Sequence, residues 1–349
     1  MNIMCQLAAY VGDRPIAPLL LRAIELQEPY AGAHASGLGV MDGDAVKVEK
    51  DFGHVARVRR TTAIESLRGT TGIAHTRYNS TARDDPRYNT ATMAHPFLND
   101  GGDLALMHNG GISNYKELWE RLRGNHTFKS YVEEVDAITD SEVAVHMLSD
   151  ALEGGMPMGE ALRTVAAQLR GSFLLACITP DHPETVWIAN WHQPCAVAVG
   201  DDEAMFCSSH IGFHEIRGEV YRVFEPPKNS LIKLTRGRVE VSPLLKERRP
   251  PSLKLNRNAL AEQILGIIKE KKEVDYIRIR EELYPEGWAK SYGVSPERLV
   301  EIFRVGVRIV NPFIEVVDSL IADGLVRERV DLRPEGGVPD TPKFSYSLV

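Results

Sequence analysis

The chain has 349 residues, of which 43% are hydrophobic and 26% are charged, and its formal net charge is −7. This balance is typical of a globular protein of about two domains, and the negative charge argues against nonspecific binding to nucleic acid or to an anionic membrane. The longest apolar runs are far shorter than the roughly 18 residues of a membrane-spanning helix, and no signal peptide opens the chain. We therefore expect a cytoplasmic protein.

Cysteine usage gives no sign of a disulfide framework or of a zinc site. The four cysteines, at positions 5, 177, 195 and 207, form no C-x-x-C pair and no cluster with histidines at zinc spacing. Such spacing is what would be needed to predict a metal site from the sequence. We expect no metal and no cofactor.

Cys5 has only four residues in front of it. A chain that begins with cysteine has a thiol nucleophile and, on the same residue, a free α-amine whose pKa of about 7.7 to 8.0 makes it a suitable base. Translation from Met4, followed by removal of that methionine, would produce such a chain. With Met1 retained, the nitrogen of Cys5 stays in an amide. Taken alone, a cysteine beside a strand is more often a small buried hydrophobic residue.

The remaining pattern predicts an α+β fold, with helices and antiparallel strands in blocks. The first elements are a strand, a helix, a hairpin with an Asp-Gly turn and two short strands, over residues 6–11, 15–26, 37–49, 71–75 and 104–108. Three amphipathic helices follow, over residues 115–123, 141–153 and 158–170. The last strands are expected over residues 172–179, 185–190, 195–200, 204–208, 220–224, 230–235 and 238–241.

Periodicity stops at residues 246–255, which contain a Glu-Arg-Arg-Pro-Pro run and are expected to link domains 5–245 and 256–349. The second domain is predicted to contain helices, a strand and a C-terminal hairpin around Gly336-Gly337, over residues 258–271, 276–279, 295–310, 312–323, 325–332 and 343–348. This order suggests a winged-helix-like module. Its candidate recognition helix, 312–323, has no basic residue, so nucleic-acid binding is not expected and a contact with protein is favoured.

Three polar clusters follow predicted strands or open a helix. Arg77 comes after a buried strand, where a guanidinium could hold a carboxylate through two hydrogen bonds. Asn109 and Gly110 offer an amide side chain and an unhindered backbone N–H, as an oxyanion hole requires. Asp140 opens a helix. Each also has a purely structural interpretation, as a turn arginine, an Asn-Gly turn and a helix N-cap.

Taken together and in order, these motifs resemble the glutaminase domain of the class II glutamine amidotransferases, which use an N-terminal nucleophile. Within that family the resemblance is greatest to the glutaminase half of glucosamine-6-phosphate synthase. The motifs are Cys5, Gly32 with Gly37, residues 74–77, 94–96, 108–110 with 114–115, 139–143 and 169–171. The resemblance covers residues 5 to about 240 and implies a four-layer αββα sandwich.

The resemblance also implies roles for individual residues. Cys5 corresponds to the nucleophile, and the side chain of Asn109 and the N–H of Gly110 to the oxyanion hole, with Gly32 in the same catalytic group. The substrate would be L-glutamine. Its α-carboxylate would bind Arg77 and its α-ammonium Asp140. The other substrate-binding residues implied by the matched motifs are Tyr78, Ser80 and His95.

The chain departs from the family pattern at three places. Ala31 stands where the family has an arginine, residues 78–82 read Tyr-Asn-Ser-Thr-Ala in place of Trp-Ala-Thr-His-Gly, and residues 256–349 replace two sugar-isomerase domains. We expect a glutaminase that passes ammonia to an acceptor protein, in a homo-oligomer or hetero-complex. One alternative is the glutaminase half of a split glucosamine-6-phosphate synthase. The other is a non-catalytic glutamine-sensing regulator that acts through the winged-helix module.

Overall fold

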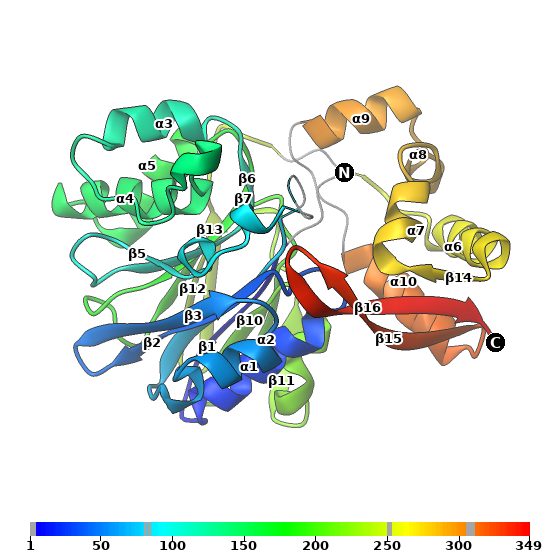
Figure 1. The fold of residues 1–349 in the computed structure, drawn as a ribbon, viewed down its shortest axis with the longest axis horizontal. Coiled ribbons are helices and arrows are strands. Elements are labelled where there is room, and N and C mark those ends of the chain that lie inside the picture. Colours follow the sequence, from blue (N-terminus) through cyan, green and yellow to red (C-terminus); the bar gives the residue numbers. More distant parts are fainter. Residues whose placement is uncertain (1–4, 80–81, 83–84, 250–252, 305–310) are drawn as a thin grey trace.

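The computed structural model describes residues 5–79, 82, 85–249, 253–304 and 311–349. Figure 1 shows an N-terminal part made of two sheets with helices, and beside it a smaller C-terminal part. Within the described ranges, no helix has the length and apolar character needed to cross a membrane.

The first sheet of the N-terminal part has seven strands, in the order β11-β9-β10-β1-β4-β2-β3, and all neighbours are antiparallel. Strand β1 lies near the middle of this sheet. The strands are β1 (Gln6–Val11), β2 (Ala35–Asp42), β3 (Ala45–Phe52), β4 (Thr71–Arg77), β9 (Ala196–Gly200), β10 (Ala204–Cys207) and β11 (Val220–Phe224).

The second sheet has six antiparallel strands, in the order β13-β12-β8-β7-β6-β5. The strands are β5 (Phe97–Leu98), β6 (Ala105–Ile112), β7 (Gly171–Ile178), β8 (Val186–Trp191), β12 (Asn229–Thr235) and β13 (Arg238–Pro243). Strand β6 continues through Asn109-Gly110-Gly111, which the sequence pattern placed in a loop, because these residues pair with β7.

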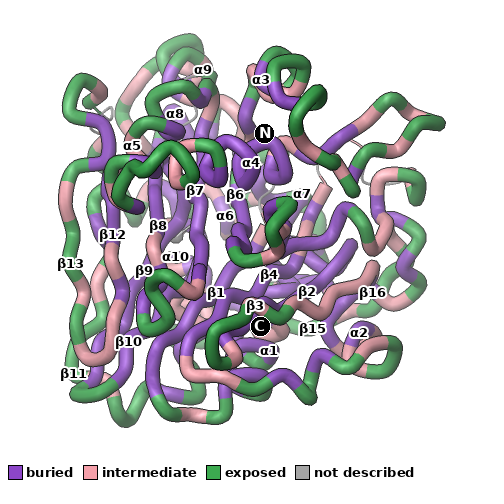
Figure 2. Tube along the Cα trace, turned by 90° about the vertical axis from the view of Figure 1, so that its left-hand side faces the viewer, coloured by how far each residue is buried: buried purple, intermediate pink, exposed green. Residues whose placement is uncertain are grey.

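The two sheets pack face to face, and helices cover their outer faces. Alternate side chains of β1 face opposite ways: Leu7 and Ala9 join the core between the sheets, whereas Tyr10 joins the core beneath α1 (Ile16–Gln27) and α2 (Val55–Thr61). On the other sheet, Phe173 and Leu175 pack with α3 (Tyr115–Leu122), α4 (Asp140–Glu153) and α5 (Met158–Gln168). Figure 2 shows β1, β7 and β8 largely buried and β13 more exposed. The arrangement agrees with the expected antiparallel sheets between helical layers.

Short 3₁₀ helices, none of which the sequence pattern predicted, lie in the connections. They are η1 (Ile64–Ser66), η2 (Pro86–Tyr88), η3 (Ala91–Met93), η4 (Glu133–Val135) and η5 (His210–Ile216).

The described residues of the C-terminal part form five helices and a three-stranded sheet with β16 in its centre, in the order β14-β16-β15. Its elements are α6 (Arg257–Lys271), β14 (Glu273–Asp275), α7 (Tyr276–Glu282), α8 (Glu286–Tyr292), α9 (Pro296–Arg304), α10 (Asn311–Ala322), β15 (Val326–Glu335) and β16 (Val338–Leu348). The hairpin turns at Gly336-Gly337, as expected.

One expectation for this part needs correction, and one helix was not expected. The predicted strand 276–279 is wrong, because these residues begin α7: the side chain of Asp275 caps the helix by accepting a hydrogen bond from the Arg278 N–H at 2.8 Å. Helix α8 was not predicted. Of the predicted helix 295–310, residues 305–310 lie outside the described ranges, as do residues 250–252 of the expected linker.

The C-terminal part, which we call the C-terminal module, shares a hydrophobic core with the sandwich. Tyr30, Ala31 and Tyr78 of the sandwich belong to the same buried cluster as Trp288 and Phe313 of the module. The ring of Tyr30 is fully buried and lies edge-on to those of Tyr276 and Phe344, with ring centroids 5.2 and 4.7 Å apart. The two parts are therefore packed as one body through apolar contacts.

Candidate active site

Cys5 lies just before β1, beside the end of the neighbouring strand β4. The antiparallel register pairs Gln6 with Thr76, and the backbone N–H of Tyr78 donates a hydrogen bond to the sulfur of Cys5 at 3.3 Å. Burial raises the pKa of the Cys5 thiol to about 11; the Tyr78 backbone and the charge of Arg77 lower it and the charge of Asp140 raises it. A thiol in this environment is protonated at neutral pH and needs a base before it can act as a nucleophile.

Arg77 is the last residue of β4, and one nitrogen of its guanidinium group is held by hydrogen bonds. Its Nη1 donates hydrogen bonds to the carbonyl oxygen of Tyr88 and to Oδ1 of Asn89, both at 2.9 Å. In the part of the chain that the structure describes, Nε and Nη2 have no hydrogen-bond partner. These two nitrogens form the edge of a guanidinium that can bind a carboxylate through two parallel hydrogen bonds.

Asp140 is the first residue of α4, and its carboxylate is held by the second sheet. Oδ2 accepts a hydrogen bond from the N–H of Ile112 at 2.8 Å, and Oδ1 lies 3.4 Å from Nδ1 of His108. Burial acts to raise the pKa of Asp140, but the charge and hydrogen bond of His108, together with the Ile112 N–H, outweigh it and lower this pKa. Asp140 is thus an ionised carboxylate suited to a cationic partner.

Asn109 and Gly110 lie side by side on β6. Asn109 is 1% exposed, yet neither its side-chain nitrogen nor its oxygen has a hydrogen-bond partner among the described residues. Gly110 has φ +128°, and a Cβ there would lie 2.0 Å from the carbonyl oxygen of Ser172, so only glycine fits. A buried amide without partners is rare in proteins, and binding sites are among the places where it occurs.

Comparison with known proteins agrees with this geometry. A family model described as a glutamine amidotransferase domain matches residues 85–212. Glutamine–fructose-6-phosphate aminotransferase (isomerizing) from Streptococcus pyogenes is 30% identical over 239 residues, which cover 68% of this chain and 37% of that protein. The protein of the same name from Thermococcus kodakarensis is 30% identical over 209 residues, 60% of this chain and 32% of the relative. The chain spans about a third of the length of these curated relatives.

The solved structure of glutamine phosphoribosylpyrophosphate amidotransferase from B. subtilis has a TM-score of 0.59 at 16% identity. The structural match covers 83% of this chain and 64% of the B. subtilis chain. At this identity the likeness shows the fold alone. Family model, curated relatives and fold agree. The sandwich is a class II glutamine amidotransferase domain.

Three histidines next to the site, at positions 75, 95 and 108, form contacts that connect β4, β6 and α4 of the amidotransferase domain. Nε2 of His75 lies 3.0 Å from the carbonyl oxygen of His108, which joins β4 to β6 next to Asn109. Nε2 of His95 lies 2.7 Å from the hydroxyl of Ser141, beside Asp140, and its ring stacks on that of His75 with centroids 3.9 Å apart. Burial lowers the pKa of His75 to about 3, so its ring is neutral. The structure thus places His95 beside Ser141 of α4, and its Nδ1 is buried without a hydrogen-bond partner among the described residues.

Gly32 supports the amidotransferase site from the loop after α1. Its φ is +152°, and a Cβ would lie 2.8 Å from the side chain of Thr76. The hydroxyl of Thr76 accepts a hydrogen bond from the N–H of Ala33 at 2.8 Å. Gly32 therefore allows this loop to approach the last residues of β4, next to Cys5 and Arg77.

Tyr78 is covered by the C-terminal hairpin, which the sequence motifs did not reveal. Its ring stacks on that of His34 with centroids 4.7 Å apart, and its hydroxyl donates a hydrogen bond to Oε1 of Glu335 at 3.2 Å. Glu335 also contacts Lys343 at 2.6 Å and His34 at 3.2 Å. Ser80, the other expected substrate contact in this segment, lies outside the described residues.

Asn89 forms a second link between the hairpin and the amidotransferase site. While its Oδ1 accepts from Arg77, its Nδ2 donates to the carbonyl oxygen of Gly336 at 3.2 Å. Asn89 and Gly336 are 247 residues apart in sequence, and Tyr78 and Glu335 are 257 residues apart. Neither pair has a local sequence signal.

No group of metal-ligand type occurs around Cys5 among the described residues. One such group, formed by Asp100, His126 and His146, is found elsewhere in the amidotransferase domain.

Proposed function

We propose that the amidotransferase domain hydrolyses L-glutamine to glutamate and ammonia, with Cys5 as the nucleophile. The observation that supports this best is the buried side-chain amide of Asn109, which has no partner among the described residues and lies next to Gly110. The contact between His75 and His108 joins β6, which carries Asn109, to β4, which ends in Arg77. An amide donor held in place before the reaction is what a tetrahedral oxyanion requires.

In the proposed reaction, Arg77 binds the α-carboxylate of glutamine and Asp140 binds its α-ammonium group. The thiol of Cys5 loses its proton to its own α-amine and attacks the carboxamide carbon. The oxyanion that forms accepts hydrogen bonds from the side chain of Asn109 and the N–H of Gly110. Ammonia then leaves with the proton from the α-amine, and water hydrolyses the γ-glutamyl thioester to glutamate and free thiol.

The proposal requires a free α-amine on Cys5. The thiol has a pKa of about 11 in its buried position, whereas an α-amine has a pKa of about 7.7 to 8.0 and lies within the same residue. With residues 1–4 attached, the nitrogen of Cys5 is an amide and cannot accept the proton. The active form would therefore begin at Cys5.

The test combines intact-mass measurement with covalent trapping. Protein expressed from its native start is treated with a diazoketone analogue of glutamine, which alkylates an activated thiol. We expect one added analogue on a chain that begins at Cys5, located on Cys5 by peptide mass spectrometry, and no addition in Cys5→Ala. An excess of glutamine should protect Cys5 from this alkylation. Absence of labelling in chains that begin at Cys5 would contradict the proposal.

We further propose that the ammonia goes to an acceptor protein. The curated relatives are named glutamine–fructose-6-phosphate aminotransferase (isomerizing), and this chain spans about a third of their length. A separate sugar-isomerase polypeptide would then be one possible acceptor. Co-purification should recover a partner that raises glutaminase turnover, and glucosamine 6-phosphate formation by the pair would identify that acceptor.

For the C-terminal module we propose a winged-helix-like fold and a regulatory role. Helix α6, strand β14, the following helices and the β15–β16 hairpin occur in the order of a winged helix, with β16 between the other two strands. The module's helix α10 contains acidic residues and no basic one, which supports a protein contact over nucleic acid. Its hairpin contacts Tyr78 and Asn89, so movement of the module would reach Cys5 and Arg77.

A further inference from the structure

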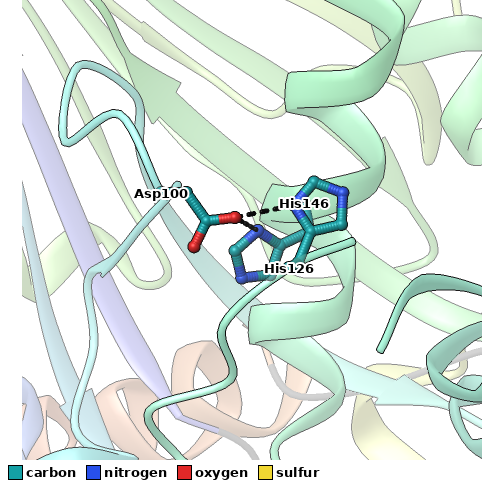
Figure 3. A group of neighbouring side chains, drawn as sticks. All are labelled: Asp100, His126 and His146. Carbon is teal, nitrogen blue, oxygen red and sulfur yellow. Dashed lines mark hydrogen bonds and ion pairs between the residues drawn. The ribbon is translucent and has the colours of Figure 1, made fainter. Parts of the chain in front are cut away.

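Three side chains away from the active site have the composition of a divalent-metal site. Asp100 lies in the turn between β5 and β6, His126 follows α3, and His146 lies on α4. One candidate ligand atom of each lies within 4.8 Å of the other two. Figure 3 shows the carboxylate of Asp100 pointing toward both imidazole rings.

His146 is the member of this group that needs an explanation. It is 1% exposed, and neither ring nitrogen has a hydrogen-bond partner among the described residues; its contact with the Thr127 backbone lies outside normal hydrogen-bond geometry. Nδ1 lies 3.8 Å from Oδ2 of Asp100, which is too long for a hydrogen bond.

His126 is oriented by carboxylates on both sides. Its Nδ1 lies 2.8 Å from Oδ2 of Asp100, and its Nε2 lies 2.9 Å from Oδ1 of Asp150. A carboxylate on the far ring nitrogen is the arrangement that orients a metal-bound histidine. Without a metal, a proton on each ring nitrogen would satisfy His126, but the same arrangement leaves His146 buried and unpaired.

We propose that Oδ2 of Asp100, Nδ1 of His126 and Nδ1 of His146 bind one zinc-type divalent ion, with water as a further ligand. Imidazole and carboxylate ligands suit such an ion. Neighbouring ligand atoms of a tetrahedral zinc site are about 3.3 Å apart, and the two observed separations, 2.8 and 3.8 Å, lie on either side of this value. The side chain of Asp100 is 41% exposed, which gives the ion a path from solvent.

The ion would join three segments that the backbone only partly connects. The segment after α3 already contacts α4, because the N–H groups of Lys129 and Ser130 donate to the carboxylate of Glu142 at 2.8 Å. It also contacts the β5–β6 turn, since the Thr127 N–H donates to Oδ1 of Asp100 at 3.2 Å. A shared ion would strengthen both contacts. The site is structural, and it does not depend on the proposed glutamine hydrolysis.

The test uses the full chain after removal of metals with a chelator. Zn²⁺ is titrated at neutral pH by calorimetry, and Co²⁺ is titrated by visible absorption, which reports tetrahedral coordination by nitrogen and oxygen. We expect one equivalent to bind in the micromolar range, with a rise in the thermal unfolding midpoint. His146→Ala should abolish binding. Asp150→Asn, which affects a carboxylate that only orients His126, should weaken it about 10- to 100-fold.

Three further variants keep the test decisive. Asp100→Asn changes an exposed side chain of nearly the same shape, so loss of binding in this variant would not result from misfolding. His214→Ala removes an exposed histidine elsewhere and should bind as the wild type does. Cys5→Ala should also retain binding, which excludes the thiol as the ligand. Equal Zn²⁺ affinity in His146→Ala, Asp100→Asn and His214→Ala, or no micromolar binding by the wild type, would overturn the proposal.

Discussion

The side-chain amide of Asn109 is buried on β6 without any hydrogen-bond partner among the described residues. A buried polar group that lacks a partner lowers stability by about 1–3 kcal/mol. This cost is offset if the amide binds an oxyanion during the reaction, because a donor already in position needs no reorganisation.

Asn109→Ala should therefore lower kcat for glutamine hydrolysis by about 10² to 10³, with little change in KM. The free energy of unfolding should stay the same or rise, since an unpaired amide is removed. Steady-state glutaminase kinetics and urea unfolding measure the two quantities. Asn125→Ala, at an exposed asparagine after α3, is the matched control. Near-normal kcat in Asn109→Ala would exclude the proposed role.

Glu28 is a second buried group whose charge state matters. Its Oε1 accepts a hydrogen bond from the N–H of Val55 at 2.7 Å, and the hydroxyls of Ser36 and Thr76 lie 3.3 Å away. Burial raises the pKa of Glu28 to about 8 in spite of these donors. The folded protein thus keeps a proton that the unfolded chain loses near pH 4.5.

This difference makes stability fall as pH rises. The contribution of protonated Glu28 is complete below pH 4.5 and is lost as pH rises through about 8. Glu28→Gln cannot ionise, so its free energy of unfolding should decrease less between pH 5 and pH 9, by about 1.4 kcal/mol for each unit of the pKa difference. Urea unfolding at both pH values measures this. Glu65→Gln, at an exposed carboxylate, should behave as the wild type.

At the scale of elements, the β15–β16 hairpin supports the residues next to Cys5 and Arg77. Glu335 accepts a hydrogen bond from Tyr78, and its pKa is lowered to about 2: burial raises it, but the hydrogen bond with His34 and the charge of Lys343 have the larger combined effect. Glu335 is therefore ionised throughout the neutral range and anchors the hairpin by its charge.

Glu335→Gln keeps the shape of this side chain and removes its charge. We expect KM for glutamine to rise by about tenfold, the equivalent of about 1.4 kcal/mol, because a hydrogen bond to a neutral amide oxygen is weaker than one to a carboxylate, while kcat changes little. The reason is that Tyr78 and the turn that holds Arg77 lose support, whereas Asn109 is unaffected. Leu332→Ala, at an exposed position on the same hairpin, should leave KM unchanged. A KM change equal in both variants would argue against a role for the hairpin.

Most elements could be predicted from the sequence, because their signals are local. Strand β1 was predicted with its observed limits, since both of its faces are apolar, and the Asp-Gly turn between β2 and β3 is a local hairpin signal. The error at residues 276–279 arose because Tyr and Ile are common in strands, whereas the N-cap Asp275 determines a helix. The cap outweighed this preference.

The residues of the candidate site likewise fall into those with a local sequence signal and those without one. Arg77, Asn109 and Asp140 belong to motifs whose order in the chain was recognisable. The contributions of Asn89, Glu335 and Lys343 were not, because each depends on packing between segments far apart in sequence. The group Asp100, His126 and His146 was missed for the same reason: it draws one residue from each of three segments.

For the whole molecule, the position of Ala31 is informative. This residue stands where the family motif has arginine, and it is 1% exposed within the apolar cluster shared with the C-terminal module. An arginine here would place a charge in that cluster. The small side chain at position 31 therefore fits the presence of the module.

Ala31→Arg should weaken the packing between the two parts by about 3 kcal/mol or more, because a buried charge without a partner is costly. We expect a lower free energy of unfolding and faster proteolysis within residues 246–255. Chemical unfolding and limited proteolysis measure these effects. Ala63→Arg, which adds the same side chain at an exposed position, is the control. Identical stability of the two variants would show that position 31 tolerates charge.

The link between Tyr78 and Glu335 also has a consequence for protein synthesis. The ribosome adds Glu335 257 residues after Tyr78. At about 5–20 residues per second, this interval lasts roughly 13 to 50 s. By the end of that time the nascent chain contains Cys5, Arg77, Asn109 and Asp140, but the ring of Tyr78 still lacks its cover. A chain that ends after the sandwich but before residue 335 would contain every proposed catalytic group without the contact from Glu335, so the site gains this support only once the hairpin has been made.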